Sequence, residues 1–590
     1  MRKSAAQARI SIISRRIANG EGLDGGAGWI RTVGTDCEQS LEASVTVPFW
    51  PARPPIPQVS RIARCVGPPS VPSAFNFQNS FLCTETPRAK YHGLSPANMI
   101  SFQTALTGSD TSGTFGPLHK IRWGIHRMRV IRYGEGWTRR HFASQLAKGI
   151  AAAGLLAPLF DVIDRNGDCA AAYPPELLSI EAYTKGKLKA GDVLNADNVD
   201  LVKDILDEVA YWQVKYDKRI IDLIGTETDV MRLCAPSYVE ATLRNKGVHQ
   251  IGPDGNVWTK EGKPWIGGNP FPEAKTAQEL LLQNALTSST LYYDSAAYAS
   301  REWEANADGD VSYSYDYIFV GYRTVGRTTL DPKPYDPGHE NLLRINGLFM
   351  TAPQDMNGSA SLEIWAYDQH KLPTSHAYSP ETKRIRSVPD SSRFETSMPG
   401  AAWFASDVAG AGDPVYTWGD FKIIGQGPFL AATHGNCHFG YPKWEVPLVG
   451  GKNGKKYFRT FMELVPEGYV VEMKPVGYPN CPYSKKRSWF DARTGIAPLI
   501  ITYDQEGKPF HQCEWFYDYA VKKPGMQWPT GMPDSFWASY LNMHMYDMKS
   551  GRMSRMGIVP EISGGLVSSI DNPRIYHQFC TLEAIRNQGR

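Results

Sequence analysis

The stretch THGNCHFG holds three side chains that can bind a metal ion within five residues. His434, Cys437 and His438 offer imidazole and thiolate ligands, which suit zinc and other transition metals. A structural zinc site usually shows four ligands at recognisable spacing, and no fourth is evident in this sequence. A glycine-rich loop with a structural cysteine is the simpler interpretation, so we predict no metal site and keep the three residues as weak candidates.

A second stretch, NMHMYDMKSGRMSRM, is rich in thioether sulfur, which can bind Cu(I). It contains Met543, His544, Met545, Met548, Met553 and Met556. Met543 and Met545 alternate as inward-facing strand residues do, and methionine adapts to irregular apolar cavities. We therefore favour a role in an apolar cavity over a copper site.

No known catalytic motif stands in the chain. NGSAS around Ser359 lacks the second glycine of G-x-S-x-G, and GHENLL at His339 has no second histidine for H-E-x-x-H. The glycine-rich phosphate-binding motifs are absent from the sequence as well. We therefore expect no covalent chemistry and no cofactor.

The elements that carry these residues change in type along the chain. NADNVDLVKDILDEVAYW predicts a helix capped by Asp197 or Asn198, and EAKTAQELLLQNAL predicts another over 273–286. From about residue 309 the hydrophobic period becomes two. The run SWFDARTGIAPLIITYDQEGKPFHQCEWFYDYAV, with turns at RTG and QEG, predicts an antiparallel meander.

These strands predict a mainly β protein with some helices, of the α+β class. A long antiparallel sheet with one wet face must curl, and we expect it to form an incomplete barrel whose concave side the two helices close. SKKRSW, residues 484–489, is interpreted as a solvated strand end. Strand alternation predicts one concave, ligand-binding face formed by Leu362, Ile364, Val471, Leu499, Ile501, Trp515 and Met543.

An export signal is predicted inside the chain. Arg139, Arg140 and Phe142 in TRRHF resemble a twin-arginine signal, and residues 150–160 are an apolar run too short to span a membrane. Ala170 and Ala172 fit a small-x-small cleavage site, which would make Tyr173 the first mature residue. The alternative is a buried amphipathic helix preceded by two surface arginines.

Residues 1–127 differ from the rest of the chain. They hold 14 lysines and arginines against 7 aspartates and glutamates, whereas residues 128–590 hold 49 against 53. The basic excess behind the net charge of +3 therefore belongs to this leader and not to a nucleic-acid-binding face. We interpret 1–127 as an upstream extension from an early start or as a disordered extension, 128–172 as the export signal, and 173–590 as a single domain.

Five cysteines follow Ala172, so an oxidising compartment would allow one or two disulfides and leave at least one thiol free. Sequence cannot fix the connectivity. The two pairings that we consider are Cys437–Cys481 and Cys513–Cys580.

Several longer stretches resemble a known bacterial family. They are GDVLNADNVDLVKDIL, GKPWIGGNPFP, GSASLEIWAYDQHK, ETKRIRSVP, GDFKIIGQ and SKKRSWFDARTG followed by ITYDQEGKPF. In this order they resemble domain-of-unknown-function family thirteen-twenty-nine, which is grouped with outer-membrane lipoprotein-sorting proteins. The resemblance implies the fold of the carriers LolA and LolB, export to the periplasm of Gram-negative bacteria and gene neighbours of the efflux-transporter type. It implies no catalytic residues.

We therefore predict a periplasmic carrier or chaperone that binds a lipid or lipoprotein acyl chain, and association with the outer membrane is an open alternative. Its expected protein partners are an efflux-type inner-membrane transporter or an outer-membrane protein, and no nucleic acid is expected. Two alternatives stay open: an exported cofactor-dependent enzyme, and a structural subunit of an envelope transport complex.

Overall fold

The computed structural model describes residues 167–287, 292–396, 398–408, 413–437, 456–478 and 480–588. All of them belong to one compact unit, residues 117–590. Residues 1–127, the signal residues Arg139, Arg140 and Phe142, and His438 lie outside the described residues. The predictions made for them stay predictions.

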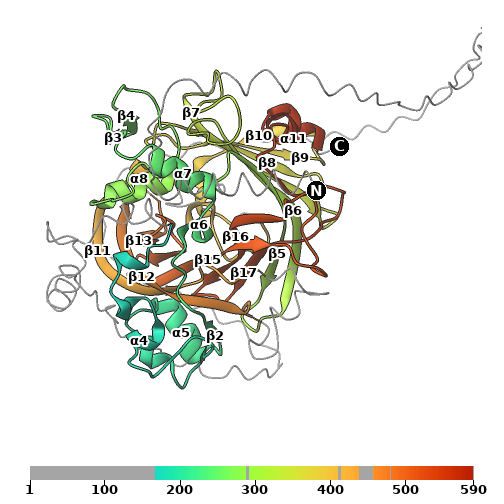
Figure 1. Cartoon of the computed structure of the whole chain (residues 1–590). Helices are drawn as coiled ribbons and strands as arrows, with labels where there is room; N and C mark the ends of the chain where they lie inside the picture. Colours follow the sequence, from blue (N-terminus) through green and yellow to red (C-terminus); the bar gives the residue numbers. More distant parts are fainter. Residues whose placement is uncertain are drawn as a thin grey trace, which may run out of the picture. The chain divides into compact units, whose positions relative to one another are not determined.

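Sixteen strands form one sheet (Figure 1). Its fourteen successive neighbours are β1 (Val193–Leu194), β2 (Ile221–Leu223), β12 (Thr460–Pro475), β13 (Tyr483–Asp491), β14 (Leu499–Asp504), β15 (Pro509–Val521), β16 (Ser535–Asp547), β17 (Met553–Ile558), β5 (Ser295–Ala305), β6 (Val311–Arg323), β7 (Leu342–Ala352), β8 (Ala360–Ala366), β9 (Thr374–Ser379) and β10 (Arg384–Val388). The other two are β11 (Trp418–Ala431), paired with β12, and β18 (Ser569–Ile570), paired with β5. A separate hairpin joins β3 (His249–Ile251) and β4 (Val257–Thr259).

The sheet is curled, open and mixed. Its path ends at β1 and β10, so it does not close into a barrel. The predicted meander is confirmed, because β13, β14 and β15 pair antiparallel in chain order. The expectation of a wholly antiparallel sheet is wrong at β2, which pairs parallel with β12. This strand comes from the helical first part of the chain, which shows no period of two.

Short helices accompany the sheet. The α-helices are α4 (Ile180–Tyr183), α5 (Glu208–Tyr216), α6 (Val230–Leu233), α7 (Pro236–Arg244), α8 (Ala277–Thr287), α10 (Ile575–Phe579) and α11 (Leu582–Gln588). The 3-10 helices are η1 (Ala170–Ala172), η2 (Pro175–Leu177), η3 (Val199–Val202), η5 (Asp390–Phe394), η6 (Ala405–Asp407) and η7 (Val415–Thr417).

Both predicted helices are present in altered form. The first is split into η3 and α5, because Asp207 caps a new helix by accepting from the amides of Val209 and Ala210. The second begins at Ala277 rather than at residue 273. The sequence pattern located both helices and missed the internal cap.

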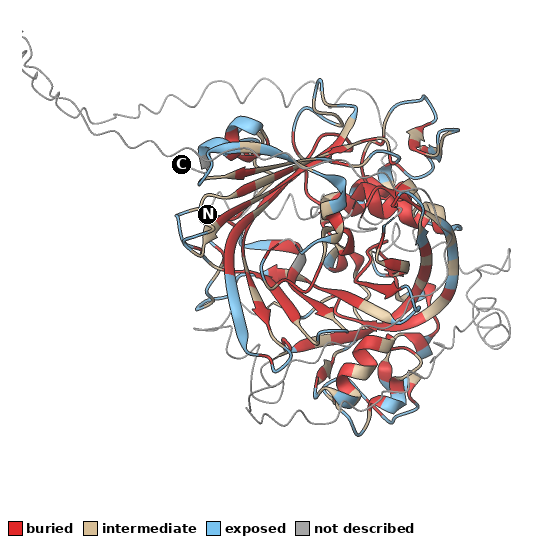
Figure 2. Ribbon diagram, turned by 180° about the vertical axis from the view of Figure 1, so that it is seen from behind, coloured by how far each residue is buried: buried red, intermediate tan, exposed pale blue. Residues whose placement is uncertain are grey.

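Much of the sheet is buried on both faces, which corrects the expectation of one wet face (Figure 2). On β12, Val471 packs in the cluster of Leu281 from α8, whereas Val470 packs with Val209 from α5. Adjacent strand residues point to opposite faces, so α5 and α8 lie on opposite sides of the sheet. Figure 1 agrees: α6, α7 and α8 lie on the inner side of the curl, and α4 and α5 lie outside it. The two predicted helices therefore do not cover the same face.

The described cysteines are free thiols, so neither considered disulfide forms here. Cys513 packs in the cluster of Trp515, and Cys580, at the end of α10, packs in the cluster of Phe579. The two thiols thus belong to different core clusters. Cys437 and Cys481 are free in the same way.

The predicted cleavage site lies within the folded unit. Ala170 and Ala172 form η1, and Ala172 is buried beside Tyr173 and Cys169. The amide of Cys169 donates to the carbonyl oxygen of Thr228 over 2.9 Å. The segment preceding residue 173 therefore makes specific contacts with the domain.

Candidate functional site

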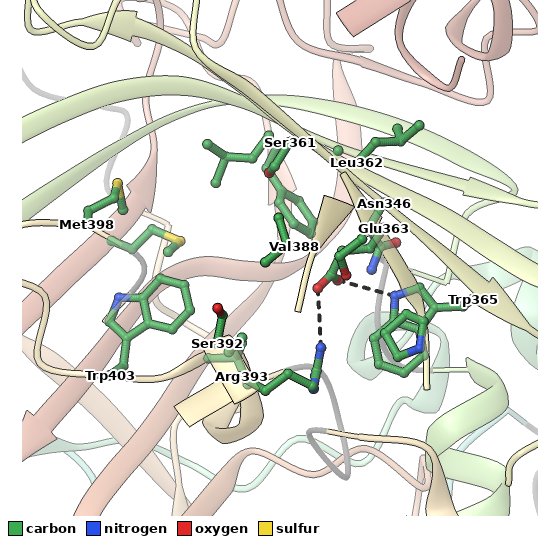
Figure 3. A pocket seen from close by; sticks show the side chains of 18 of the residues that line it. Asn346, Ser361, Leu362, Glu363, Trp365, Val388, Ser392, Arg393, Met398 and Trp403 are labelled. Carbon is green, nitrogen blue, oxygen red and sulfur yellow. Dashed lines mark hydrogen bonds and ion pairs between the residues drawn. The ribbon is translucent and has the colours of Figure 1, made fainter. Parts of the chain in front are cut away.

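A cavity of about 440 Å³ lies on the inner side of the curled sheet (Figure 3). Strands β6 to β9 form one wall, and β15, β16 and β17 contribute to the other. Most of the lining side chains are aromatic or aliphatic, which is usual for sites that bind small apolar molecules. The aromatic and methionine side chains of the lining are Tyr292, Tyr317, Phe319, Trp365, Met398, Trp403, Trp515, Tyr517, Met543 and Met556.

A segment that we call the strap, residues 389–408, crosses this cavity and supplies part of its lining. Hydrogen bonds hold its middle to the sheet. The hydroxyl of Tyr315 donates to the carbonyl oxygen of Pro399 over 2.8 Å, and the amide of Ala402 donates to Ser554 Oγ over 2.8 Å. The strap contains η5 and η6 but otherwise lacks regular structure, so such contacts must fix its position.

Buried ion pairs fix the first part of the strap. Arg393 in η5 pairs with Glu363 of β8 over 3.3 Å and with the buried carboxylate of Asp413. Asp413 also accepts a 3.0 Å hydrogen bond from Trp418 Nε1. Glu363 accepts a further 3.3 Å hydrogen bond from the indole of Trp365. The dashed lines in Figure 3 show Glu363 between Arg393 and Trp365.

The end of the strap is held by a buried aspartate. Asp407 accepts hydrogen bonds from His511 Nδ1 over 2.7 Å and from the hydroxyl of Tyr483 over 2.5 Å. Burial alone would raise the pKa of Asp407, but the neighbouring His511 and these hydrogen bonds hold it below its usual value. The carboxylate therefore stays charged in the folded protein.

Lys486, which belongs to the stretch SKKRSW, also holds the strap against the sheet. Lys486 is completely buried, lies 4.2 Å from the ring centroid of Trp418 and donates to the carbonyl oxygen of Ser406 over 2.5 Å. The interpretation of this stretch as a solvated strand end is thus wrong at Lys486. The strap covers the side of β13 on which Lys486 lies.

Two carboxyls lie behind the cavity wall. Glu302 and Glu304 of β5 are both fully buried and hydrogen-bonded to each other. Trp403 Nε1 donates to Glu302 Oε1 over 2.7 Å, and the hydroxyl of Tyr317 donates to Oε2 over 3.0 Å. Burial raises the pKa of both carboxyls, and the proximity of Glu302 raises that of Glu304 further. Two buried carboxyls in contact share a proton at neutral pH.

Polar groups gather at one end of the cavity. Asn346 and Glu363 lie opposite each other on β7 and β8, and both line the cavity. Asn346 is only 6 % exposed, and no donor among the described residues reaches its Oδ1. Behind them, Arg344 stacks on the ring of Trp365 at 4.1 Å, and burial lowers the pKa of Arg344 to about 9.

The structure brings together three of the seven residues predicted to form the ligand face. Leu362, Trp515 and Met543 are among the residues that line the cavity. The other four do not line it and lie in separate core clusters: Ile364, Val471, Leu499 and Ile501. Period-two alternation separates the faces of each strand, but it cannot tell which face is concave when both are apolar.

The weak metal candidates are placed as follows. His434 Nε2 lies 3.0 Å from the carbonyl oxygen of Gly225 and 3.4 Å from Glu463. The amide of Cys437 donates to Asp518 over 2.9 Å. Among the residues described, no group of three or more His, Cys, Asp or Glu could hold a metal ion.

Several lining residues were missed. Glu363 and Trp365 stand on β8, whose other face was predicted to line the cavity, and Asn346 stands on the neighbouring β7, from which no cavity residue was predicted. Arg393 and Trp403 come from the strap, whose sequence has no periodicity. The alternation of β8 does contain Glu363 and Trp365 as one face, so the signal was present and was assigned to the opposite side.

A family model for proteins of unknown function, DUF1329, matches residues 193–586, more than half of the chain. The chain belongs to the DUF1329 family. The match begins at β1 and ends within α11, so it covers the whole curled sheet and confirms the resemblance seen in the sequence.

Three solved structures are similar to this DUF1329 chain at 12 % identity each. They are a DUF1329 protein of Desulfovibrio piger (TM-score 0.34, 52 % of this chain and 97 % of that one), a putative outer-membrane lipoprotein-sorting domain of Vibrio parahaemolyticus (0.32, 53 % and 98 %) and a LolA superfamily protein of Nitrosomonas europaea (0.29, 51 % and 97 %). These likenesses are remote and do not tell what this chain binds. No match is found among curated proteins.

No helix within the described residues combines the length and apolar character needed to cross a bilayer.

Proposed function

We propose that this protein is a carrier or chaperone that binds one hydrophobic molecule, a lipid or acyl chain, in the cavity under the strap. The observation that supports it is the 440 Å³ cavity with its aromatic and methionine lining. Burial of each CH₂ group contributes about 0.8 kcal/mol, so a lipid needs no catalytic constellation to bind there. We propose accordingly that the protein is not an enzyme.

We propose further that the protein works in the periplasm and serves an envelope transport system. The twin-arginine-like residues Arg139 and Arg140 support export. An efflux-type inner-membrane transporter or an outer-membrane protein is the proposed partner. Changing both arginines to lysine should leave unprocessed precursor in the cytoplasm, and unimpaired export of this variant would contradict the twin-arginine route.

Native mass spectrometry of protein purified from its own cells tests the binding proposal. We expect a non-covalent adduct with the mass of a lipid, which organic extraction removes. The extracted protein should then bind the neutral fluorescent probe N-phenyl-1-naphthylamine. An adduct that proves to be a metal or an organic cofactor would favour the alternative of an enzyme, and protein without adduct or probe binding would favour a structural subunit.

A matched pair of variants locates the site. Ser361→Trp places a large ring at a lining position of β8 and should weaken probe binding at least tenfold. Ser387→Trp makes the same change at an exposed position of β10 that does not line the cavity and should leave binding unchanged. Circular dichroism must show both variants folded. Equal binding by the two folded variants would place the probe elsewhere and contradict the proposal.

A further inference from the structure

We infer that the ligand of this cavity is an amphiphile whose polar end donates hydrogen bonds, a hydroxyl or an ammonium group, and not a carboxylate or phosphate. This inference rests on the proposed carrier function and names the class of molecule carried. Three features of the described residues support it: an acceptor without a donor, the balance of charge around the cavity, and the separation of polar and apolar lining.

The acceptor is Asn346 Oδ1. Its side chain comes from β7 on the cavity side, as Figure 3 shows, and it is 6 % exposed. A buried amide oxygen without a donor costs about 1–3 kcal/mol, and a ligand that donates a hydrogen bond recovers this free energy. A carboxylate or a fully ionised phosphate has no proton to donate and would instead place its oxygens against Oδ1.

Glu363 adds a second acceptor at the same end. It lies directly opposite Asn346 across β7 and β8. Its hydrogen bonds from Arg393 and from the indole of Trp365 are both 3.3 Å long. A carboxylate offers about four lone-pair sites, so Glu363 retains capacity to accept from a ligand. Two acceptors side by side define a site for a donor.

The charges around the cavity also oppose an anion. Among the described residues that line the cavity, Arg393 is the only lysine or arginine, and it is already paired with Glu363 and Asp413. The exposed part of the lining carries Asp390 and Glu395. A carboxylate or phosphate entering there would meet like charges and find no unpaired cation in the lining.

Nearby arginines do not change this balance. Arg344 stacks behind Trp365, donates to the carbonyl oxygen of Ala285 over 2.7 Å and does not line the cavity. Arg384 and Arg386 of β10 are exposed and are likewise outside the lining. Solvent and salt screen their charges.

An apolar region of the lining would hold the hydrocarbon part. Phe319 of β6 and Leu348 of β7 lie opposite each other. Leu348 follows Asn346 by two residues on β7, so both side chains are on the same face of the sheet. Met398 and Trp403 of the strap and Met543 and Met556 of the sheet complete this region. The cavity thus has one polar end and a larger apolar part, as an amphiphile does.

Competition against N-phenyl-1-naphthylamine tests the inference with three molecules of equal chain length: decanol, decylamine and decanoate. At neutral pH we expect decanol and decylammonium to compete at least tenfold more tightly than decanoate. Asn346→Leu should weaken the binding of decanol about three- to tenfold relative to that of the probe, the range of one hydrogen bond. Asn587→Leu, an exposed change on α11, is the control.

A further variant separates the two head groups. If the site prefers an ammonium group, Glu363→Gln should lower the affinity for decylammonium more than the affinity for decanol. If the site prefers a hydroxyl group, the variant should lower both affinities equally. Decanoate that binds as tightly as decanol, or a folded Asn346→Leu variant with unchanged decanol affinity, would overturn the inference while probe binding still supports a carrier. Failure of the probe and of all three molecules to bind would overturn the proposed function itself.

Discussion

At the scale of single residues, the burial of charged side chains departs most from what the sequence indicates. In SREWEANAD, alternation places Glu302 and Glu304 on one face and Trp303 on the other, which favours a solvated acidic face. The structure buries both carboxyls completely and leaves Trp303 partly exposed. The donors to Glu302 are Trp403 and Tyr317, and the donor to Glu304 is Ser554. All three are remote in the chain, so no local pattern could reveal this arrangement.

The shared proton of this pair predicts a pH dependence. The pKa of Glu304 is raised in the folded protein, so the folded state retains a proton that the unfolded chain releases above about pH 4. Stability should therefore be highest at low pH with respect to this group and fall as pH rises towards the raised pKa, by at most about 1.4 kcal/mol per pH unit.

Glu304→Gln tests this dependence, because an amide cannot ionise but can still donate to Glu302 and accept from Ser554. Urea unfolding at pH 5 and pH 8 should show that the variant gains stability relative to the parent as pH rises. Glu583→Gln, exposed on α11, is the control. Parallel pH profiles for the parent and Glu304→Gln would show that the pair holds no such proton.

At the scale of elements, the strap is the part that sequence periodicity cannot find. Its residues show neither a period of two nor one of 3.6, and its position depends on contacts such as that of Asp407 with His511, 104 residues apart. The strands and the two main helices, by contrast, follow from local patterns. What the patterns leave open is which sheet face each helix covers, because both faces of β12 and β14 are apolar.

The strap also supports a stability prediction. Asp407→Ala should lower the free energy of unfolding by about 3–5 kcal/mol, because it leaves buried His511 and Tyr483 without their acceptor. It should also make the strap a preferred site of limited proteolysis and weaken probe binding. Asp390→Ala, exposed on the same strap, should change stability by less than about 0.5 kcal/mol. Similar proteolysis of both variants would contradict the anchoring role of Asp407.

At the scale of the whole molecule, the family, the mainly β class and the curled sheet could all be predicted from the sequence. The motifs run in family order, and repeated strands of apolar residues must curl to cover their surface. The position of the cavity could not be predicted, because it depends on the strap and on strands from both halves of the sheet. Only three of the seven proposed cavity residues line it for this reason.

The boundary of the folded unit gives the last prediction. Cys169 and Ala172 are 0 % and 3 % exposed, and the backbone of residue 168 bridges to that of Asp229. A chain that begins at Tyr173 should therefore be less stable than one that begins at Gly167, by about 2–4 kcal/mol, because buried apolar contacts and the hydrogen bond to Thr228 are lost.

Urea unfolding of the two chains measures this difference, and equal stability would show that the contacts of 167–172 contribute nothing. N-terminal sequencing of the native protein is a separate measurement. A first residue of Tyr173 would confirm the predicted cleavage and show that the mature protein lacks the contacts of residues 167–172. A first residue at or before Gly167 would contradict that cleavage site and show that the export signal is removed at a position where the folded unit stays intact.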